Sequence, residues 1–480
     1  MLGANEVTAL QNGSLRIHSL DIQLEPRSAK FPNFRGPGSI RQNASGQLIF
    51  ELYDTNANPT FSRQPGEGAP GGLVPDDHYY GLTAVDQDGR RWTADRILPR
   101  YSVGGAGSGA GAGSVCGGWI PEMSCPEEGS FPQALRLFLP GSFEIPVSHL
   151  TEEVKVRSPL GPPRTRLMRP PSEDEREEVG HSSIINIWKL DLANLNITVE
   201  LSNAGLDITA APKGQELPAG LDTRIEETLS FVLAHPCRWL FKMERRGGAG
   251  TTCLRSRSTR DFKSDIRPPV DWDYIPSDDV AMLFQQYLAY IQPYSEPRYH
   301  PTSVNVLQVL RASAQTVEAE ALALAVAIES LLNREYTDCG VPEPELLAEV
   351  ARLETLISQS NLTDNTKTRA LGAVSRLKSA NPGSCLRQMT KVSSHVTMDL
   401  VAAWDNIRKP SAHGREIEVP FEELVHLCDK AYLLFCLLIF NRIGYTGEYK
   451  NRTLKGWPEA VFAPFWPQRA VPVTEERSRS

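Results

Sequence analysis

The sequence lacks any long hydrophobic run. Its most apolar stretch, YLLFCLLIF at 432–440, is far shorter than the roughly 20 residues that a membrane-spanning helix needs. The N-terminal segment MLGANEVTALQNGS has neither the basic start nor the apolar core of a secretory signal. We therefore expect a cytoplasmic protein with no membrane partner, and a buried helix rather than an anchor at 432–440.

Paired-cysteine motifs are also missing. The eight cysteines include no CxxC pair, and their spacing fits neither a zinc knuckle nor a secreted disulfide framework. Cys428 and Cys436 lie within an apolar helical stretch, where free cysteine acts as a small core residue. The cysteines indicate a reducing compartment, and we expect no metal site and no cofactor.

Nucleotide-binding and hydrolase signatures are absent as well. No GxSxG and no Walker sequence occurs. The stretch VGGAGSGAGAGSVCGG at 103–118 has GxG steps, but it lacks the GK[ST] ending of a phosphate loop. We interpret it as a flexible insertion. A second flexible insertion is expected at 156–178, which is rich in proline and charge.

Positive charge is in short supply overall, because the formal net charge is −8. Nucleic-acid binding would therefore need a local basic patch. One stretch, 238–267, carries nine Lys and Arg against three acids, with aromatic residues between them. Its candidate RNA-binding residues are Arg245, Arg246, Arg255 and Arg257. An equally good interpretation is a strand hairpin with a solvated loop, and the sequence does not separate the two.

Short alternating or β-branched runs fill the chain up to about residue 295. They are SLRIHSLDIQL, QLIFELY, YYGLTAV, ALRLFLP, SIINIWKL and LNITVEL, separated by Gly, Pro, Asn and Asp clusters. One helix is expected at 221–234. The pattern predicts an N-terminal β-rich domain, 1–295, built as a sandwich or barrel.

Helical periodicity takes over from about residue 300. Apolar residues recur at helical spacing in five stretches, 313–336, 342–359, 366–379, 385–408 and 420–444. Five helices with short connections predict an all-α bundle. The fold class expected is thus α+β multidomain, with a β-rich domain, a helical bundle at 300–455 and a C-terminal tail at 456–480.

The segment WDNIRKPSAHG at 404–414 holds the most informative pair of side chains. Pro410 is unsuited to a helix interior and also restricts Lys409. We therefore expect the helix to end or kink here, with Arg408 at its end and His413 in the turn beyond. Such a pair is found on many ordinary surfaces, so the motif alone is not specific.

With its context, this segment resembles the HEPN domain (higher eukaryotes and prokaryotes nucleotide-binding), whose R-x4-6-H motif lies on a helical bundle. AIESLL in the first long helix and IFNRIGYTGEYKNR after the last one add to the likeness. The β-rich half followed by this bundle resembles the ApeA-type HEPN ribonucleases of anti-phage defence. The resemblance covers about 300–455.

The resemblance implies a metal-independent endoribonuclease, an effector of abortive infection in bacteria. In this chemistry the ribose 2′-OH attacks the adjacent phosphate. Histidine suits the proton transfers, and guanidinium suits the charge on the phosphorane. His413 is then the general acid/base and Arg408 the transition-state stabiliser, while Lys409 and Arg415 could contact RNA.

Two further residues are candidates. Glu329, in AIESLL, could orient His413 or pair with Arg408, but it could equally be an intrahelical partner of Asn333 or Arg334. Catalytic HEPN motifs usually carry a polar acceptor directly after the arginine, where this chain has Lys409. Asn406 is the candidate substitute for that acceptor.

The resemblance also implies partners. One Arg–His pair leaves a second proton transfer unassigned, and HEPN proteins usually dimerise so that two motifs face one cleft. We expect RNA as substrate, a homodimer through the helical domain, and an N-terminal domain that senses a phage-derived trigger or restrains the nuclease. The alternatives are a non-catalytic HEPN module that binds nucleotide or RNA, and a bundle that serves only in dimerisation.

Overall fold

The computed structural model of the chain gives the fold of most of its length. The residues it describes are 4–55, 73–102, 114–127, 129, 131–145, 153–156, 164–167, 186–214, 216–257, 266–271, 277–294, 298–340, 344–378, 381–412 and 419–466.

The chain forms two compact units. The first comprises residues 1–222 and 237–261, and the second comprises 223–236 and 262–480. The first is rich in strands and the second in helices, which confirms the α+β class and the order of the two halves. The division differs from the border expected near 295–300, because α3 (Leu221–Val232) and everything from residue 262 belong mainly to the helical unit.

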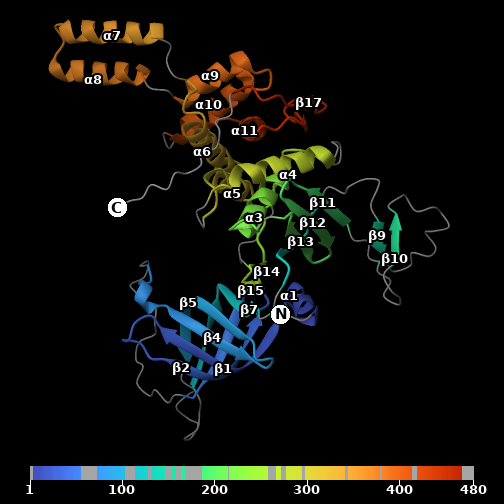
Figure 1. Ribbon diagram of the computed structural model, residues 1–480. Helices are drawn as coiled ribbons and strands as arrows, with labels where there is room; N and C mark the ends of the chain where they lie inside the picture. The colour runs from blue at the N-terminus through green and yellow to red at the C-terminus, as the bar shows by residue number, and fades with distance from the viewer. Residues whose placement is uncertain are drawn as a thin grey trace. The chain divides into compact units, whose positions relative to one another are not determined.

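A closed six-stranded barrel is the centre of the first unit (Figure 1). Going round it, the strands are β5 (Arg91–Ser102), β4 (Tyr80–Asp86), β1 (Arg16–Pro26), β2 (Phe34–Gln42), β3 (Leu48–Asp54) and β6 (Ser114–Ile120), and β6 pairs with β5 again. All neighbours are antiparallel. Alternate residues of β3 and β4 are buried, as expected of strands with one face on a core.

Seven further strands extend the sheet from the barrel. They run outward from β5 in the order β7 (Glu122–Glu127), β15 (Ala249–Arg255), β14 (Phe241–Arg246), β8 (Ala134–Pro140), β13 (Gly205–Pro212), β12 (Leu195–Ser202) and β11 (Asn186–Asp191). A short helix, α1 (Ala4–Gln11), and a 3-10 turn, η1 (Asp76–His78), complete the unit.

Both expected insertions contain strands. Residues 114–118, predicted as part of a flexible loop, lie in β6 and pair with β3 and β5. The strand has little room for side chains at Gly117 and Gly118, because a Cβ at either position would lie about 3 Å from neighbouring atoms. In the second insertion, β9 (Glu153–Val156) pairs with β10 (Arg164–Leu167). The rest of both insertions lies outside the described residues.

The helical unit is organised around α6 (Val317–Glu335). It packs against α5 (Pro301–Ser313), α10 (Met398–Ala412) and α11 (Phe421–Ile443). The other helices are α4 (Ser277–Ile291), α7 (Pro344–Gln359), α8 (Asp364–Ser375) with the 3-10 turn η2 (Arg376–Lys378), and α9 (Pro382–Val392). A small hairpin of β16 (Glu448–Lys450) and β17 (Glu459–Val461) follows α11. No helix in the described part of the chain is long and apolar enough to cross a membrane.

The helix predicted at 385–408 is two helices. α9 ends at Val392, and the Ser393 hydroxyl accepts hydrogen bonds from the His395 and Val396 amides in the turn that follows. Of the end or kink predicted at Pro410, the end is wrong, since α10 continues to Ala412. A proline this close to a helix end removes only one backbone bond, the one to the carbonyl four residues back.

The cysteines are not all free thiols, although their spacing in the sequence does not fit a secreted disulfide framework. Cys339, just after α6, is bonded to Cys385 in α9. Cys428 and Cys436 are buried in α11, as predicted, and burial raises the pKa of both thiols to about 12.

Candidate functional site

Arg408 is presented by α10, the helix that carries the predicted motif. One side of α10 is apolar and buried, through Val401, Trp404 and Ile407 among others, and it packs on α6 and α11. Arg408 follows this stripe directly. Its side chain therefore lies at the border between the bundle core and the solvent.

Glu329 of α6 meets Arg408 in a two-pronged ion pair. Arg408 Nε donates to Glu329 Oε2 at 2.8 Å, and Arg408 Nη2 donates to Glu329 Oε1 at 3.0 Å. Pairing with Arg408 was one of the options that the sequence left open for Glu329, beside His413 and the intrahelical partners Asn333 and Arg334. The side chains are 34% and 36% exposed, so the pair remains open to a ligand.

The pair shifts both protonation equilibria. The hydrogen bond from Arg408 lowers the pKa of the Glu329 carboxyl despite its partial burial. The same hydrogen bond raises the pKa of the guanidinium, and Glu329 and Asp405 add to this by charge. Arg408 therefore stays charged and Glu329 stays ionised throughout the neutral range.

Trp404 is a member of this site that the sequence did not reveal as one. The Arg408 guanidinium carbon lies 5.1 Å from the centre of its ring, and the indole Nε1 donates to the Ala325 carbonyl at 3.3 Å. The signal was present, because residues four apart on a helix lie on the same side. A buried indole below the guanidinium helps to hold it in place.

A guanidinium has five N–H donors, and Glu329 takes two of them. Among the described residues, none accepts a hydrogen bond from Nη1 or from the second donor on Nη2. These donors form another fork, which suits a phosphate or carboxylate. One edge of Arg408 is thus fixed by protein, and the other can bind an anion.

The remaining predicted site residues are not all brought together. Asn406 is exposed, and two residues along a helix turn through about 200°, so it faces away from Arg408. Lys409 lies within α10. His413 and Arg415 lie outside the described residues.

The basic stretch of the first unit is folded into ion pairs and ring contacts. Arg245 lies 3.6 Å from Glu127 and over the Phe131 ring. Arg246 bonds Glu244 at 2.8 Å.

The other two candidate RNA-binding arginines of that stretch also contact protein groups. Arg255 bonds Glu122 at 3.1 Å and stacks on Trp239, with its guanidinium carbon 3.6 Å from the ring centre. The Arg257 amide donates to the Gly46 carbonyl at 3.0 Å, and the Arg257 stem packs on that glycine. These contacts support the interpretation of a strand hairpin more than that of a free phosphate-binding surface.

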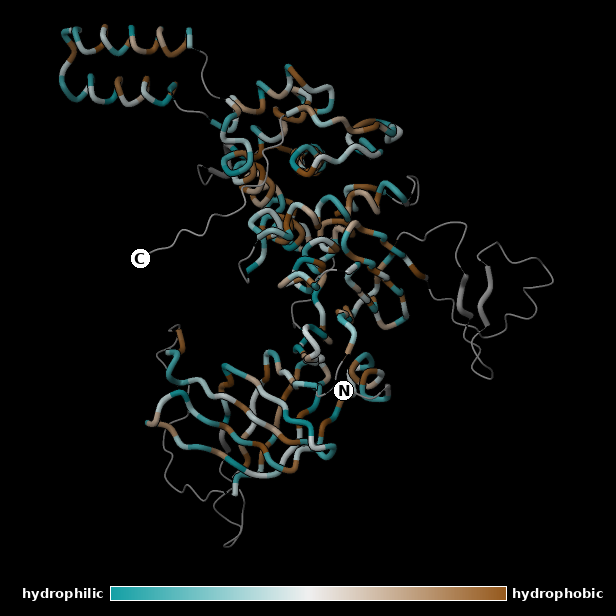
Figure 2. Tube along the Cα trace, in the orientation of Figure 1, coloured by the Kyte–Doolittle hydropathy of each residue, from teal (hydrophilic) through white to brown (hydrophobic). Residues whose placement is uncertain are grey.

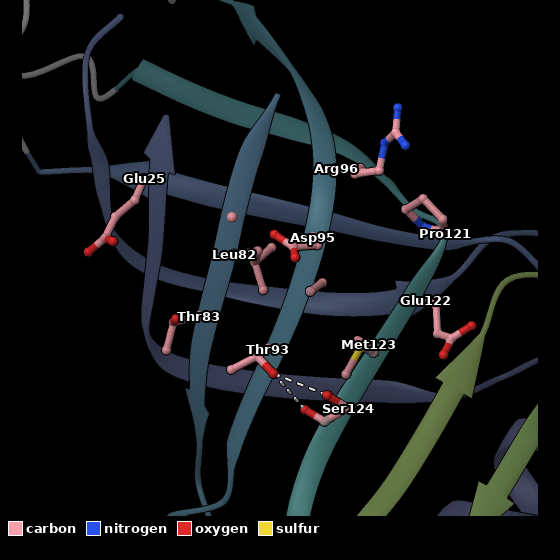
Figure 3. A pocket seen from close by; sticks show the side chains of 12 residues that line it. Glu25, Leu82, Thr83, Thr93, Asp95, Arg96, Pro121, Glu122, Met123 and Ser124 are labelled. Carbon is pink, nitrogen blue, oxygen red and sulfur yellow. Dashed lines mark hydrogen bonds between the residues drawn. The ribbon is translucent and has the colours of Figure 1, made fainter. Parts of the chain in front are cut away.

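A groove of about 580 Å³ lies on the first unit, where β5 joins β7 (Figure 3). β5 bulges there, with Asp95 and Arg96 placed opposite the single residue Gly81. Arg96 has a φ of 58°, a left-handed conformation uncommon for a residue with a side chain. The lining residues are Glu25, Gly81, Leu82, Thr83, Thr93, Ala94, Asp95, Arg96, Pro121, Glu122, Met123 and Ser124.

The groove combines charge with hydroxyl groups. Three carboxylates and one guanidinium line it, and the Thr93 and Ser124 hydroxyls lie 3.1 Å apart. Its size falls within the range of small-ligand sites, and bulges are common beside such sites.

Comparison of the sequence with protein-family models and with curated proteins found no match, and comparison with solved structures found none either.

Proposed function

We propose that this chain is a metal-independent endoribonuclease of the HEPN type, with its site at Arg408 and His413. The observation that carries the proposal is the fixed guanidinium of Arg408. Glu329 and Trp404 hold it at the edge of a helical bundle, and no described residue accepts a hydrogen bond from its second fork of N–H donors. Helix α10, which presents it, is described as far as Ala412, the residue before His413 in the sequence.

The proposed reaction is a transesterification. The ribose 2′-OH attacks the adjacent phosphorus, the bond to the 5′-oxygen breaks, and a 2′,3′-cyclic phosphate is left. The open fork of Arg408 binds the phosphorane oxygens, where negative charge develops. The His413 imidazole moves a proton to or from the reacting oxygens near neutral pH.

A second copy of the chain is part of this proposal, since one histidine serves only one of the two proton transfers. An exposed apolar stripe on α6 supports it. Leu322 and Val326 lie seven and three residues before Glu329, on the same side of the helix, and are 48% and 51% exposed. Packing of this stripe on its symmetry mate would bring two Arg408 residues towards one cleft.

The proposed biological role is that of a cytoplasmic effector in bacterial anti-phage defence. The first unit would sense a phage-derived trigger or restrain the nuclease, and the groove beside β5 is a candidate place for a ligand. This part rests on the resemblance of the sequence to ApeA-type proteins.

The competing proposal is a non-catalytic HEPN module that binds nucleotide or RNA. Lys409 favours it, because lysine cannot accept the hydrogen bond that would orient His413. In such a module, Arg408 would bind phosphate without cleavage.

The two proposals are separated by incubating the purified protein with RNA in EDTA. The nuclease should leave 2′,3′-cyclic phosphate or 3′-phosphate ends. His413→Ala should lower the rate by at least about 100-fold. His426→Ala, a change at an exposed histidine of α11, is the matched control and should keep the parental rate.

Variants of the ion pair test the role of the guanidinium. Arg408→Lys should be inactive, because an ammonium keeps the charge but loses the fork. Glu329→Gln should slow cleavage by up to about 100-fold through loss of positioning, without unfolding the protein. Cleavage by His413→Ala at the parental rate would refute the nuclease proposal, and RNA binding that is lost in Arg408→Ala would then support the binding module.

A further inference from the structure

α7 and α8 form a helical hairpin that makes few contacts with the other helices of the unit. The two helices lie side by side and run in opposite directions (Figure 1), and their main contacts are with each other and with η2. Lys367 Nζ donates to the Ser358 carbonyl at 3.2 Å, and Lys378 bonds Glu354 at 2.6 Å.

The hairpin has almost no core of its own. Val350 is the one buried residue of α7, and α8 has none in the described part of the chain. Hydrophobic residues nevertheless recur along both helices (Figure 2). Five leucines of the hairpin are between 41% and 60% exposed, namely Leu346, Leu353, Leu356, Leu362 and Leu377.

Three of these leucines share one side of α7. Positions 346, 353 and 356 are separated by seven and three residues, which places them within one helical stripe. Short helices gain most of their stability from packing such a stripe. An exposed leucine stripe on a pair of helices is therefore a surface that another molecule covers.

The charges of the hairpin indicate what covers it. α7 carries three glutamates and one arginine, a net −2. α8 with η2 carries one aspartate against two lysines and two arginines, a net +3. A surface with one acidic and one basic helix is complementary to itself once it is turned over.

We propose that the α7–α8 hairpin packs face to face on the same hairpin of a second copy of this chain. Of the two twofold arrangements, one stacks α7 on α7 of the mate, and the other stacks α7 on α8 of the mate. The charges select the second, which makes an antiparallel four-helix arrangement with an isologous interface.

The size of the face sets the strength of this contact. A helix of the length of α7 spans about 24 Å, and helices pack 8–10 Å apart. The face is thus about 450 Å² per partner, roughly half of a standard interface. The contact alone should form a weak dimer whose population rises with concentration.

The inference is independent of the proposed nuclease and of its stripe on α6. The test therefore uses the full chain with Leu322→Asp and Val326→Asp, so that only the hairpin can self-associate. Sedimentation velocity over a range of concentrations should show a monomer–dimer equilibrium. Adding Leu353→Asp and Leu356→Asp should raise the dissociation constant at least about tenfold, while Leu20→Asp, a change at an exposed leucine of β1, should not.

A charge reversal tests the stacking without touching the leucines. Because residues 358 and 367 lie side by side, antiparallel helices place 349 level with 376. Glu349→Arg should weaken the dimer, and Arg376→Glu in addition should restore it. A chain that stays monomeric at every concentration would overturn the proposal in favour of a different partner. So would an equilibrium that neither the two leucine substitutions of α7 nor Glu349→Arg moves.

Discussion

His300 lies at the N-terminus of α5 with its side chain almost fully buried. Its Nδ1 accepts a hydrogen bond from the Thr302 amide at 3.2 Å, which makes the imidazole the N-cap of the helix. Tyr290 and Tyr294 flank the ring edge to face. Burial, aided by the charge of Arg334, lowers the pKa of His300 to about 4.

This histidine should make the helical unit sensitive to acid. In the unfolded chain it takes up a proton near pH 6.5, whereas in the folded chain it does so only near pH 4. Stability is therefore complete above about pH 6.5 and falls as the pH drops to 4, by about 3 kcal/mol in all. An imidazolium also cannot accept the Thr302 hydrogen bond.

His300→Asn keeps a capping acceptor and removes the titration. Urea denaturation at several pH values should show that the free energy of unfolding of the variant, relative to that of the parent, rises by about 3 kcal/mol from pH 7 to pH 4. The carboxylates titrate in both proteins, so their effect on the free energy of unfolding cancels when the variant is compared with the parent. Parallel stability curves would contradict this account.

The sequence could predict some residues of the site but not their surroundings. Arg408 was found from its motif, and Glu329 from its place in the first long helix. Their pairing joins residues 79 positions apart, and sequence reasoning left it as one of several options. The sequence carried no signal for the burial of His300, because a histidine before a proline does not show that Tyr290 of α4 and Tyr294 beyond the end of α4 enclose it.

At the scale of elements, the disulfide links the chain segments immediately before and after the α7–α8 hairpin. Cys339 and Cys385 are 46 residues apart and enclose the whole hairpin. Beside the bond, the Gly340 amide donates to Gln388 Oε1 at 2.8 Å. The two ends of the hairpin are thereby held at one place in the helical unit.

Removing this bond should lower the stability of the helical unit. Closing a loop of this length restricts the unfolded chain by about 4 kcal/mol in the chain-entropy model. Cys385→Ser should thus lose about 2–4 kcal/mol without reductant, and dithiothreitol should destabilise the parent but not the variant. The disulfide assignment would be refuted if dithiothreitol did not change the stability of the parent and if both thiols reacted with an alkylating agent without reductant.

Element prediction succeeded where the pattern is local. β8 was expected at 134–140 and observed at Ala134–Pro140, because alternation marks a strand within seven residues. β2 was not expected, because Gly36, Pro37 and Gly38 break the pattern. It forms through pairing with β1 and β3, and a Cβ at Gly36 or Gly38 would clash with the backbone of β3. This pairing depends on the two neighbouring strands, so the pattern within the nine residues of β2 does not show it.

At the scale of the whole molecule, the chain crosses between its two units more than once. α3 precedes β14 and β15 in the sequence, but residues 223–236 belong to the helical unit. The Phe231 ring stacks on Tyr287 of α4 with centres 4.6 Å apart. A sequence border placed near residue 295 therefore assigns both α3 and α4 to the β-rich domain, although both belong mainly to the helical unit. Hydrophobic periodicity cannot show which core a helix joins.

Polar contacts strengthen the link between α3 and the helical unit. Glu227 forms a buried ion pair with Arg224 and accepts the His300 amide through Oε1 at 2.5 Å. Glu226 Oε2 accepts the Tyr299 hydroxyl at 3.0 Å. Without α3, the donors of His300 and Tyr299 would lose their partners.

A chain of residues 262–480 should consequently fail to adopt fixed tertiary structure, although its helices are complete. Loss of the Phe231 ring lowers the free energy of unfolding by about 3–5 kcal/mol. Each buried donor left without a partner lowers it further, by about 1–3 kcal/mol. The total approaches the 5–15 kcal/mol that stabilises a typical domain. Near-ultraviolet circular dichroism should show no ordered aromatic signal, whereas the same chain with residues 221–236 joined to its N-terminus through a flexible linker should recover it. A cooperative unfolding transition in the shorter chain would show that the helical unit does not need α3.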